Sequence, residues 1–353
     1  MIDHHRLACA LVTLFCLSGF AAAEEKPLSR IMFGSCARHN QPQPIWDSIV
    51  QAKPELFLFI GDNIYGDSRD IDVLQAKYKE LFDKPGFVKL RETCPLLATW
   101  DDHDYGENDA GEEYPSKVAS QKLFNDVYGV PDDSPRRKRP GIYDAQIFGP
   151  AGRRVQVILL DTRYFRSPLR TWTKDQRPAG RGPYRPHEDD HDGTMLGDAQ
   201  WKWLKDELKK PAELRIIASS IQVIPYEHCW EMWGNFPAER KRLFDLIRET
   251  EAGGVIFISG DRHLAEISRI ESKESGAPYP LYDVTSSSLN APGSGANDDE
   301  PNRYRVGDNF LNINFGSIVV DWEQQSPTVE FSIQDGEGKV VLDQKIRLSD
   351  LSP

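Results

Sequence analysis

Short apolar runs alternate with segments of helical periodicity over the first two-thirds of the chain, and this alternation is what most restricts the fold. The runs are rich in Ile, Val, Leu and Phe, as strands buried on both faces are. Strands that alternate with helices in this way are typical of parallel sheets joined by crossover helices. The predicted strands are 30–33, 56–60, 95–100, 155–160, 214–219 and 255–259, and the predicted helices are 44–52, 73–82, 116–128, 198–209 and 239–250.

The pattern changes after residue 259, where closely spaced strands follow one another without intervening helices. These strands are predicted over 315–321, 328–333 and 339–348. A mixed sheet system in one domain over residues 24–353 fits this order better than two domains do. Segments 163–197 and 291–302 are predicted to be long loops, and residues 136–139 a basic turn.

The N-terminus has the pattern of a secretory signal peptide over residues 1–23. His4, His5 and Arg6 precede an apolar stretch over 7–20, and Ala21, Ala22 and Ala23 offer small residues for cleavage. The apolar stretch is short for a membrane span, although an uncleaved anchor is the alternative. We therefore expect a periplasmic or secreted protein with no transmembrane anchor after cleavage.

Composition limits the classes of partner. The chain of 353 residues has 43 Lys and Arg against 55 Asp and Glu, a net charge of −12, and 39% apolar residues. The apolar share predicts a packed core, and the negative charge argues against stable nucleic-acid binding. Signal cleavage would leave three cysteines, so at least one is unpaired; a disulfide between Cys94 and Cys229 stays open, and the residues indicate no oligomeric state.

Polar side chains that can bind metals follow each of the six predicted strands. Because the carboxyl ends of parallel strands meet at one edge of a sheet, these side chains are expected to gather there. So many carboxylates in one place would repel each other unless cations neutralised them. The residues that follow the strands are, in order, Cys36, Asp62, Asp101-Asp102-His103, Asp161, Gln222 and Asp261-Arg262-His263.

The donor types suggest two different cations. The two oxygens of Asp62 suit a bridge between two ions, and the phenol of Tyr65, three residues on, would bind an acidic metal such as ferric iron together with the Cys36 thiolate. Oxygen donors from Asp62, Asp102, Asp261 and Gln222 suit Ca²⁺, with Mg²⁺ or Mn²⁺ as alternatives.

Each of these residues also has an ordinary structural role. An Asp at a strand end often caps or forms a turn, and Asp161 is as readily a turn residue as a functional one. Cys36 or Tyr65 alone would be a core residue. Their joint occurrence favours metal binding. His228, Trp230 and Trp233 either line an entrance or simply pack.

Six blocks of sequence together resemble the PhoD-like alkaline phosphatases and phosphodiesterases, a branch of the calcineurin-like metallophosphatases related to the purple acid phosphatases. The resemblance runs over about residues 31–333. The blocks are Gly34-Ser35-Cys36, Gly61-Asp62-x-x-Tyr65, Thr99-Trp100-Asp101-Asp102-His103-Asp104, Leu160-Asp161-Thr162-Arg163, Leu196-Gly197-x-x-Gln200-Trp201-x-Trp203-Leu204 and Ser259-Gly260-Asp261-Arg262-His263.

The resemblance implies an α/β fold, a four-layer αββα sandwich with mixed sheets, and a binuclear centre. It implies a ferric site made by Cys36, Asp62, Tyr65 and His263, with Asp62 as the bridge. The positions that match the second, Ca²⁺-type site are Asp102, Gln222 and Asp261, while Asp101 is either a ligand or a neighbour of one. Two departures are the missing N-terminal β-domain of many members and Asp104, where Glu is common.

The activity implied is hydrolysis of phosphate mono- or diesters, including lipid esters, by a water activated at the metals. His103 matches the histidine that binds phosphate or protonates the leaving group. Arg163 and Arg262, with Arg38 nearby, are candidate phosphate clamps. Rival hypotheses are a phospholipase-like or teichoic-type phosphodiesterase and a non-catalytic Ca²⁺-binding exported protein. A serine hydrolase has little support because Gly34-Ser35-Cys36 lacks the Gly-x-Ser-x-Gly spacing.

Overall fold

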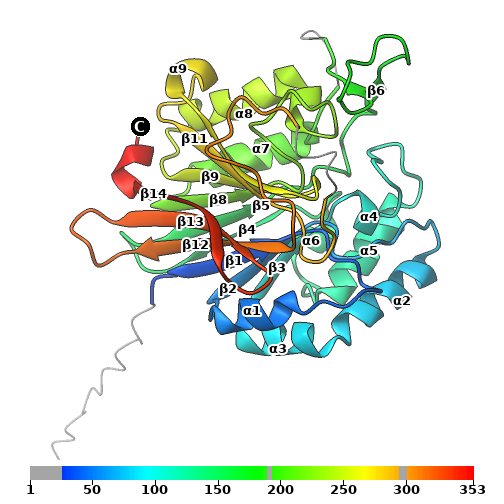
Figure 1. Cartoon of the computed structure of the whole chain (residues 1–353), viewed down its shortest axis with the longest axis horizontal. Coiled ribbons are helices and arrows are strands. Elements are labelled where there is room, and N and C mark those ends of the chain that lie inside the picture. Colours follow the sequence, from blue (N-terminus) through cyan, green and yellow to red (C-terminus); the bar gives the residue numbers. More distant parts are fainter. Residues whose placement is uncertain (1–25, 189–192, 294–299) are drawn as a thin grey trace, which may run out of the picture.

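Two six-stranded sheets form the middle of the molecule, and helices cover their outer faces (Figure 1). The computed structural model describes residues 26–188, 193–293 and 300–353. The signal peptide predicted over 1–23 lies outside the described residues, as does part of each predicted long loop. The four-layer αββα sandwich expected from the resemblance is the observed architecture.

The first sheet joins the early strands of the chain to its C-terminal strands. Its three early strands are parallel to one another, and the three late strands continue the sheet in antiparallel fashion from β1. The spatial order is β14 (Val340–Arg347), β13 (Thr328–Asp335), β12 (Asn314–Asp321), β1 (Arg30–Gly34), β2 (Leu56–Ile60) and β3 (Leu96–Thr99).

The second sheet is built from the middle of the chain. Four of its strands, β11, β9, β8 and β5, are parallel, and an antiparallel strand closes each edge. The spatial order is β10 (Ala265–Ile270), β11 (Leu281–Ser286), β9 (Val255–Ser259), β8 (Leu214–Ala218), β5 (Val155–Leu159) and β4 (Asp144–Phe148). A separate pair, β6 (Arg170–Thr171) and β7 (Tyr184–Arg185), lies in the predicted long loop.

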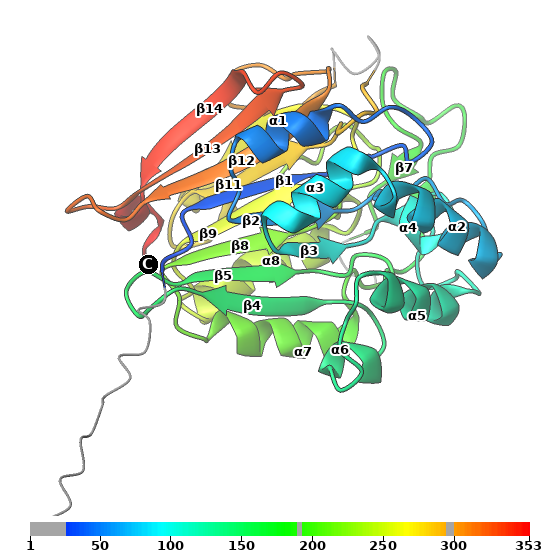
Figure 2. The same ribbon diagram turned by 90° about the horizontal axis from the view of Figure 1, so that it is seen from below.

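The helices form the two outer layers. In both views α1 and α3 lie against the first sheet, whereas α7 and α8 lie beyond the second sheet (Figures 1 and 2). The helices are α1 (Ile45–Gln51), α2 (Ile71–Phe82), α3 (Pro85–Thr93), α4 (Asp102–Tyr105), α5 (Lys117–Val127), α6 (Pro135–Lys138), α7 (Gly197–Leu208), α8 (Pro237–Glu249) and α9 (Ser272–Ser275), with 3₁₀ turns η1 (Trp233–Asn235) and η3 (Leu348–Leu351).

Strand β2 shows why the chain needs four layers. Successive side chains of a strand point to opposite faces, and all five residues of this strand are fully buried. Leu58 belongs to the core between the two sheets, whereas Phe57 and Phe59 pack edge-on against Trp46 of α1, with ring centroids 5.8 Å away in each case. An apolar run of this kind therefore requires cover on both faces.

The predicted strands and helices are confirmed to within a few residues. The helices α3, α4 and α9 and the strands β4, β6, β7, β10 and β11 were not predicted, and the short helix α9 interrupts the strands expected to follow one another after residue 259. The basic turn over 136–139 is largely the short helix α6. Its arginines serve the fold: Arg136 donates to the Ala98 carbonyl and Arg137 to the Val130 carbonyl. Among the residues described, no helix combines the length and apolarity needed to cross a membrane.

Candidate metal centre

The carboxyl ends of both sheets meet, and the predicted site residues lie where they meet. Cys36 and Asp62 follow β1 and β2, and Asp102 begins α4 after β3, all from the first sheet. Asp261 and His263 follow β9 of the second sheet. These side chains therefore converge as predicted. They come from the ends of strands in two sheets, however, and not from the edge of a single sheet.

The backbone at this edge is strained at four of the predicted ligands. Cys36, Asp62, Asp261 and His263 have φ angles of 59°, 49°, 67° and 54°, in the left-handed region that costs an ordinary residue about 1 kcal/mol or more. Gly61 has a φ of 112°, and a Cβ there would lie 2.7 Å from that of Asp101. Such strain clusters at functional sites, where the surrounding structure holds it in place.

One group of donors contains sulfur, oxygen and nitrogen. Ligand atoms of Cys36, Asp62 and His263 lie within 4.8 Å of one another. The Cys36 Sγ is 3.3 Å from the Asp62 Oδ2, and the Tyr65 hydroxyl is 2.8 Å from the His263 Nε2. The four residues predicted for the ferric site are thus brought together.

Two further groups extend the first. Asp62 also lies within 4.8 Å of Asp102 and His103, and Asp102 in turn groups with Asp101 and Asp261. Asp62 therefore belongs to both the sulfur-containing group and an oxygen-rich one, as a bridging carboxylate would.

Burial and mutual repulsion penalise the charges of these carboxylates. Burial and the nearby Cys36 raise the pKa of Asp62 well above its ordinary value, and burial also raises the pKa of Asp261 well above its own. Burial raises the pKa of Asp101 to about 7, with Arg163 opposing the shift. At Asp102 burial also raises the pKa, but the positive charges of His103 and Arg163 outweigh it and hold the pKa below its usual range.

The residues fit a pair of cations. Four side-chain oxygens of the candidate ligands are buried and accept no hydrogen bond within the described ranges, a costly arrangement that a cation would relieve. The donor set of sulfur, phenol, imidazole and carboxylates consists of side chains that bind metal ions. The four oxygens are Asp62 Oδ1, Asp101 Oδ2, Asp102 Oδ1 and Gln222 Oε1.

The sulfur-containing group also needs a cation to ionise. Burial raises the pKa of the Cys36 thiol to about 11, and burial together with Cys36 raises the pKa of Tyr65 well above its ordinary value. Burial and the charge of Arg262 lower the pKa of His263 to about 4, so its imidazole is neutral and free to bind a metal.

His103 stands at the entrance of this cluster. Its Nδ1 is 2.6 Å from the Asp67 Oδ1, and its ring centroid is 4.3 Å from that of Tyr65. Burial alone would lower the pKa of His103, but Asp102, Asp62 and Asp67 raise it to about 11, so the ring is an imidazolium. It lines a cavity of about 550 Å³, whose lining is Asp62, Asp102, His103, Asn108, Asp109, Trp230, Asp261, Arg262, His263, Pro292 and Gly293.

Arg163 lies beneath the carboxylates rather than in the cavity. Its side chain is fully buried and pairs with Asp101, whose Oδ1 is 2.6 Å from the Arg163 Nε, and with Glu231, 2.5 Å from Nη1. The Arg163 guanidinium therefore already donates its hydrogen bonds to these two acids rather than to a ligand in the cavity. The phosphate clamp predicted for Arg163 is thus replaced by a positioning role. Arg262, in contrast, does line the cavity, although Glu300 holds it at 3.0 and 2.7 Å.

The remaining predicted residues have mainly structural contacts. Asp161 accepts hydrogen bonds from the Trp100 indole and from three backbone N–H groups, so it is a turn residue. Gln222 donates to Glu266 and Thr285 at 2.7 and 2.9 Å, which leaves its amide oxygen for other partners.

Several supporting residues were missed or left open by sequence reasoning. Asp104 accepts from the backbone N–H groups of Asn63, Ile64 and Asp101, so it ties the loop after β2 to the start of α4. Its place in the Trp-Asp-Asp-His-Asp block was the available signal. Asp67, Glu231 and Glu300 lie in segments without a distinguishing pattern, whereas Ser287, 3.2 Å from the Cys36 sulfur, directly follows β11, a strand that was not predicted.

The cysteines of the described chain are all unpaired. Cys36, Cys94 and Cys229 are buried and free, so the disulfide between Cys94 and Cys229 that the sequence left open does not form.

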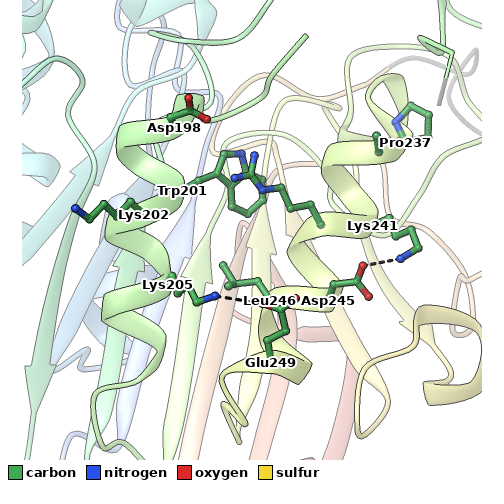
Figure 3. A pocket seen from close by; sticks show the side chains of 11 residues that line it. Asp198, Trp201, Lys202, Lys205, Pro237, Lys241, Asp245, Leu246 and Glu249 are labelled. Carbon is green, nitrogen blue, oxygen red and sulfur yellow. Dashed lines mark hydrogen bonds and ion pairs between the residues drawn. The ribbon is translucent and has the colours of Figure 1, made fainter. Parts of the chain in front are cut away.

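A second, larger cavity lies between α7 and α8 and is unrelated to this site. Its volume is about 820 Å³ (Figure 3). Four of its charged groups pair with one another: Lys205 Nζ is 3.3 Å from Glu249, and Lys241 Nζ is 2.5 Å from Asp245. Trp201 is covered by Arg242, 4.4 Å from its ring. None of the predicted site residues lines it, so the chemistry belongs to the smaller cavity.

Comparisons with known proteins agree with this geometry. A curated relative, alkaline phosphatase D of Bacillus subtilis (strain 168), is 24% identical over 307 residues, covering 74% of this chain and 51% of the relative. The chain thus spans about half the length of that relative. A solved structure of PhoD matches with a TM-score of 0.67 at 15% identity, covering 92% of this chain and 73% of that one.

A dimetal phosphatase from Danio rerio also matches, with a TM-score of 0.52 at 13% identity, covering 92% of this chain and all of that one. At these identities the two structures show the fold alone. The family model described as PhoD-like phosphatase matches residues 31–346, nearly the whole chain. The chain therefore belongs to the PhoD-like phosphatase family.

Proposed function

We propose that this protein is an exported binuclear-metal phosphoesterase that hydrolyses phosphate mono- or diesters, as an alkaline phosphatase D does. Membership of a phosphatase family supports a phosphoric ester hydrolase, and the grouped donors support metal dependence. The observation that carries the proposal is the position of Asp62, which belongs to two donor groups at once.

Cys36, Asp62, Tyr65 and His263 would hold ferric iron, and Asp62 with Asp102, Asp261, Gln222 and Asp101 would hold Ca²⁺, with Mg²⁺ or Mn²⁺ as alternatives. Bound there, the cations would supply Lewis acidity that lowers the pKa of water and neutralises charge on phosphoryl oxygens. Gln222 is the least supported of these residues, because only its orphaned oxygen argues for it.

The chain's own residues complete the reaction. His103 lines the cavity as an imidazolium held by Asp67, so it is placed to hydrogen-bond a phosphoryl oxygen or give a proton to the leaving oxygen. Arg262 lines the same cavity and would bind a non-bridging oxygen. Arg163 holds one oxygen of Asp101, and the other oxygen, Oδ2, accepts no hydrogen bond from the described residues and would be available to a cation.

The test replaces Asp62 by Asn. We expect loss of p-nitrophenyl phosphate or bis-p-nitrophenyl phosphate hydrolysis by at least a hundredfold, with less bound metal by elemental analysis, because an amide cannot bridge two cations as a carboxylate does. Asp47→Asn, at an exposed position of α1, is the matched control and should keep full activity. A folded Asp62→Asn protein with normal activity would contradict the proposal. An inactive wild type that still binds Ca²⁺ would instead favour the non-catalytic Ca²⁺-binding alternative.

Phosphodiester hydrolysis, including phospholipase-like or teichoic-type activity, is a second candidate. One observation favours it: His103 and Asn108 line both the metal-side cavity and a neighbouring one of about 460 Å³, where Arg69 lies. A diester has an arm on each side of the phosphorus, which two adjacent cavities would accommodate. A higher kcat/KM for bis-p-nitrophenyl phosphate than for p-nitrophenyl phosphate would favour this candidate.

The ferric assignment has its own test. Phenolate and thiolate bound to ferric iron absorb visible light, so we expect a coloured protein that loses its colour in Tyr65→Phe. Tyr226→Phe, which changes a phenol outside the donor groups, should keep the colour. A colourless wild-type protein with a full complement of iron would contradict the assignment of Tyr65 and Cys36.

We also propose a periplasmic or secreted location, supported by the signal pattern of residues 1–23. The partners proposed are small-molecule or lipid phosphate esters. Stable nucleic-acid binding is not expected for a chain of net charge −12.

A further inference from the structure

We propose that Trp230 is a stacking platform for the leaving group, so that the preferred substrates are phosphate esters with a planar aromatic leaving group. This inference rests on the proposed function and adds a substrate class to it.

Trp230 lies at the cavity that contains the candidate metal ligands. It shares the lining with Asp62, Asp102 and Asp261, and 38% of its surface is exposed. In the part of the chain that the structure describes, the other exposed large apolar side chains are all Val or Ile, and none of them lines this cavity. The neighbouring His228 and Trp233, which the sequence grouped with Trp230, are buried instead.

The loop that carries Trp230 is fixed before any ligand arrives. The carbonyls of His228 and Cys229 accept hydrogen bonds from the backbone N–H groups of Gly182 and Tyr184 at 2.7 and 2.9 Å, and the backbone N–H of Trp230 donates to the His228 Nδ1 at 3.1 Å. A Cβ at Gly182 would lie only 2.2 Å from the Cys229 oxygen, so the two segments touch.

Cys229, the residue before Trp230, has a φ of 60°, a strained backbone angle for a residue with a side chain. An indole held in this way loses little freedom when a ligand stacks on it.

The indole is placed next to the group that would hold the phosphate. The Arg262 guanidinium lies 5.1 Å from the ring centroid of Trp230, and its Nη1 is 3.6 Å from the Asp261 carboxylate. Arg177 approaches the same ring at 5.9 Å. A substrate whose phosphoryl group reaches Arg262 therefore has its leaving group within reach of the exposed part of an indole over which two guanidinium groups lie, and both groups favour a planar π system.

The experiment compares two esters of matched size, phenyl phosphate and cyclohexyl phosphate, of which only the first has a planar leaving group. In Trp230→Ala we expect kcat/KM for phenyl phosphate to fall about tenfold, mostly through KM, because a stacking contact is lost. For cyclohexyl phosphate the value should change less than twofold. Trp230→Phe should restore most of the loss, and Trp230→Leu, which keeps apolar bulk without a planar face, should not.

Trp203→Ala on α7, whose ring packs on Tyr143 away from this cavity, is the matched control and should leave the ratio of the two esters unchanged. Equal losses for both esters, or no loss for phenyl phosphate, would overturn the inference while leaving the proposed function intact. A wild-type protein that hydrolyses neither of these monoesters would overturn this inference, and one that also hydrolyses neither p-nitrophenyl phosphate nor bis-p-nitrophenyl phosphate would overturn the proposed function with it.

Discussion

Arg163 illustrates how burial decides what a charged side chain does. The sequence places it two residues after a strand end, where a phosphate-binding arginine is a natural prediction. In the fold its guanidinium is enclosed by Asp101 and Glu231, and Glu231 also lies 3.0 Å from the Arg166 Nε. The buried guanidinium groups of Arg163 and Arg166 thus share the buried carboxylate of Glu231, and Arg163 in turn orients Asp101.

Glu231→Gln should therefore be strongly destabilising. The change removes the negative charge that Glu231 places beside two fully buried guanidinium groups. Breaking a buried ion pair in this way costs about 3 kcal/mol of folding free energy. We expect the free energy of unfolding in urea to fall by that order, and kcat to fall as well because Asp101 loses its support.

Glu249→Gln offers the matched comparison, since Glu249 pairs with Lys205 at the surface, where an ion pair contributes less than about 1 kcal/mol. Equal stabilities for Glu231→Gln and Glu249→Gln would show that the buried network is not what fixes Asp101.

The central strands were predictable because each is a continuous apolar run bounded by breakers. β2 and β9 are buried at every position, which only a strand covered on both faces requires, and the sequence shows this directly. The strand β4 is partly exposed and pairs along one side only, so its residues, such as Gln146, lack that pattern. The helix α3 follows α2 after only two residues, so the sequence pattern did not separate it from α2 as a second helix.

The candidate ligands were predictable for the same reason, since each follows a strand whose end is fixed by hydrophobic burial. The residues that hold these ligands in place were not predictable in this way. Glu231 and Glu300 reach the site through loop packing, and Ser287 follows β11, a strand that was not predicted, at a sequence separation of 251 from Cys36. No local periodicity encodes such contacts.

The site joins the two halves of the molecule. Cys36, Asp62 and Asp102 come from the first sheet, whereas Asp261 and His263 come from the second. Cations held between these groups would act as a link across the sandwich, and without them the same carboxylates repel each other at the place where the sheets meet. Stability of the whole domain should therefore depend on metal.

Removing the metals with a strong chelator should lower the melting temperature by about 10 °C. A ligand present at a hundred times its dissociation constant stabilises by about 2.7 kcal/mol per site, and two sites in a domain of this size correspond to a shift of that order. Differential scanning calorimetry with and without chelator measures it, and adding metal back should restore the original value. An unchanged melting temperature in protein shown by elemental analysis to be metal-free would mean that the two sheets are held by their apolar core alone.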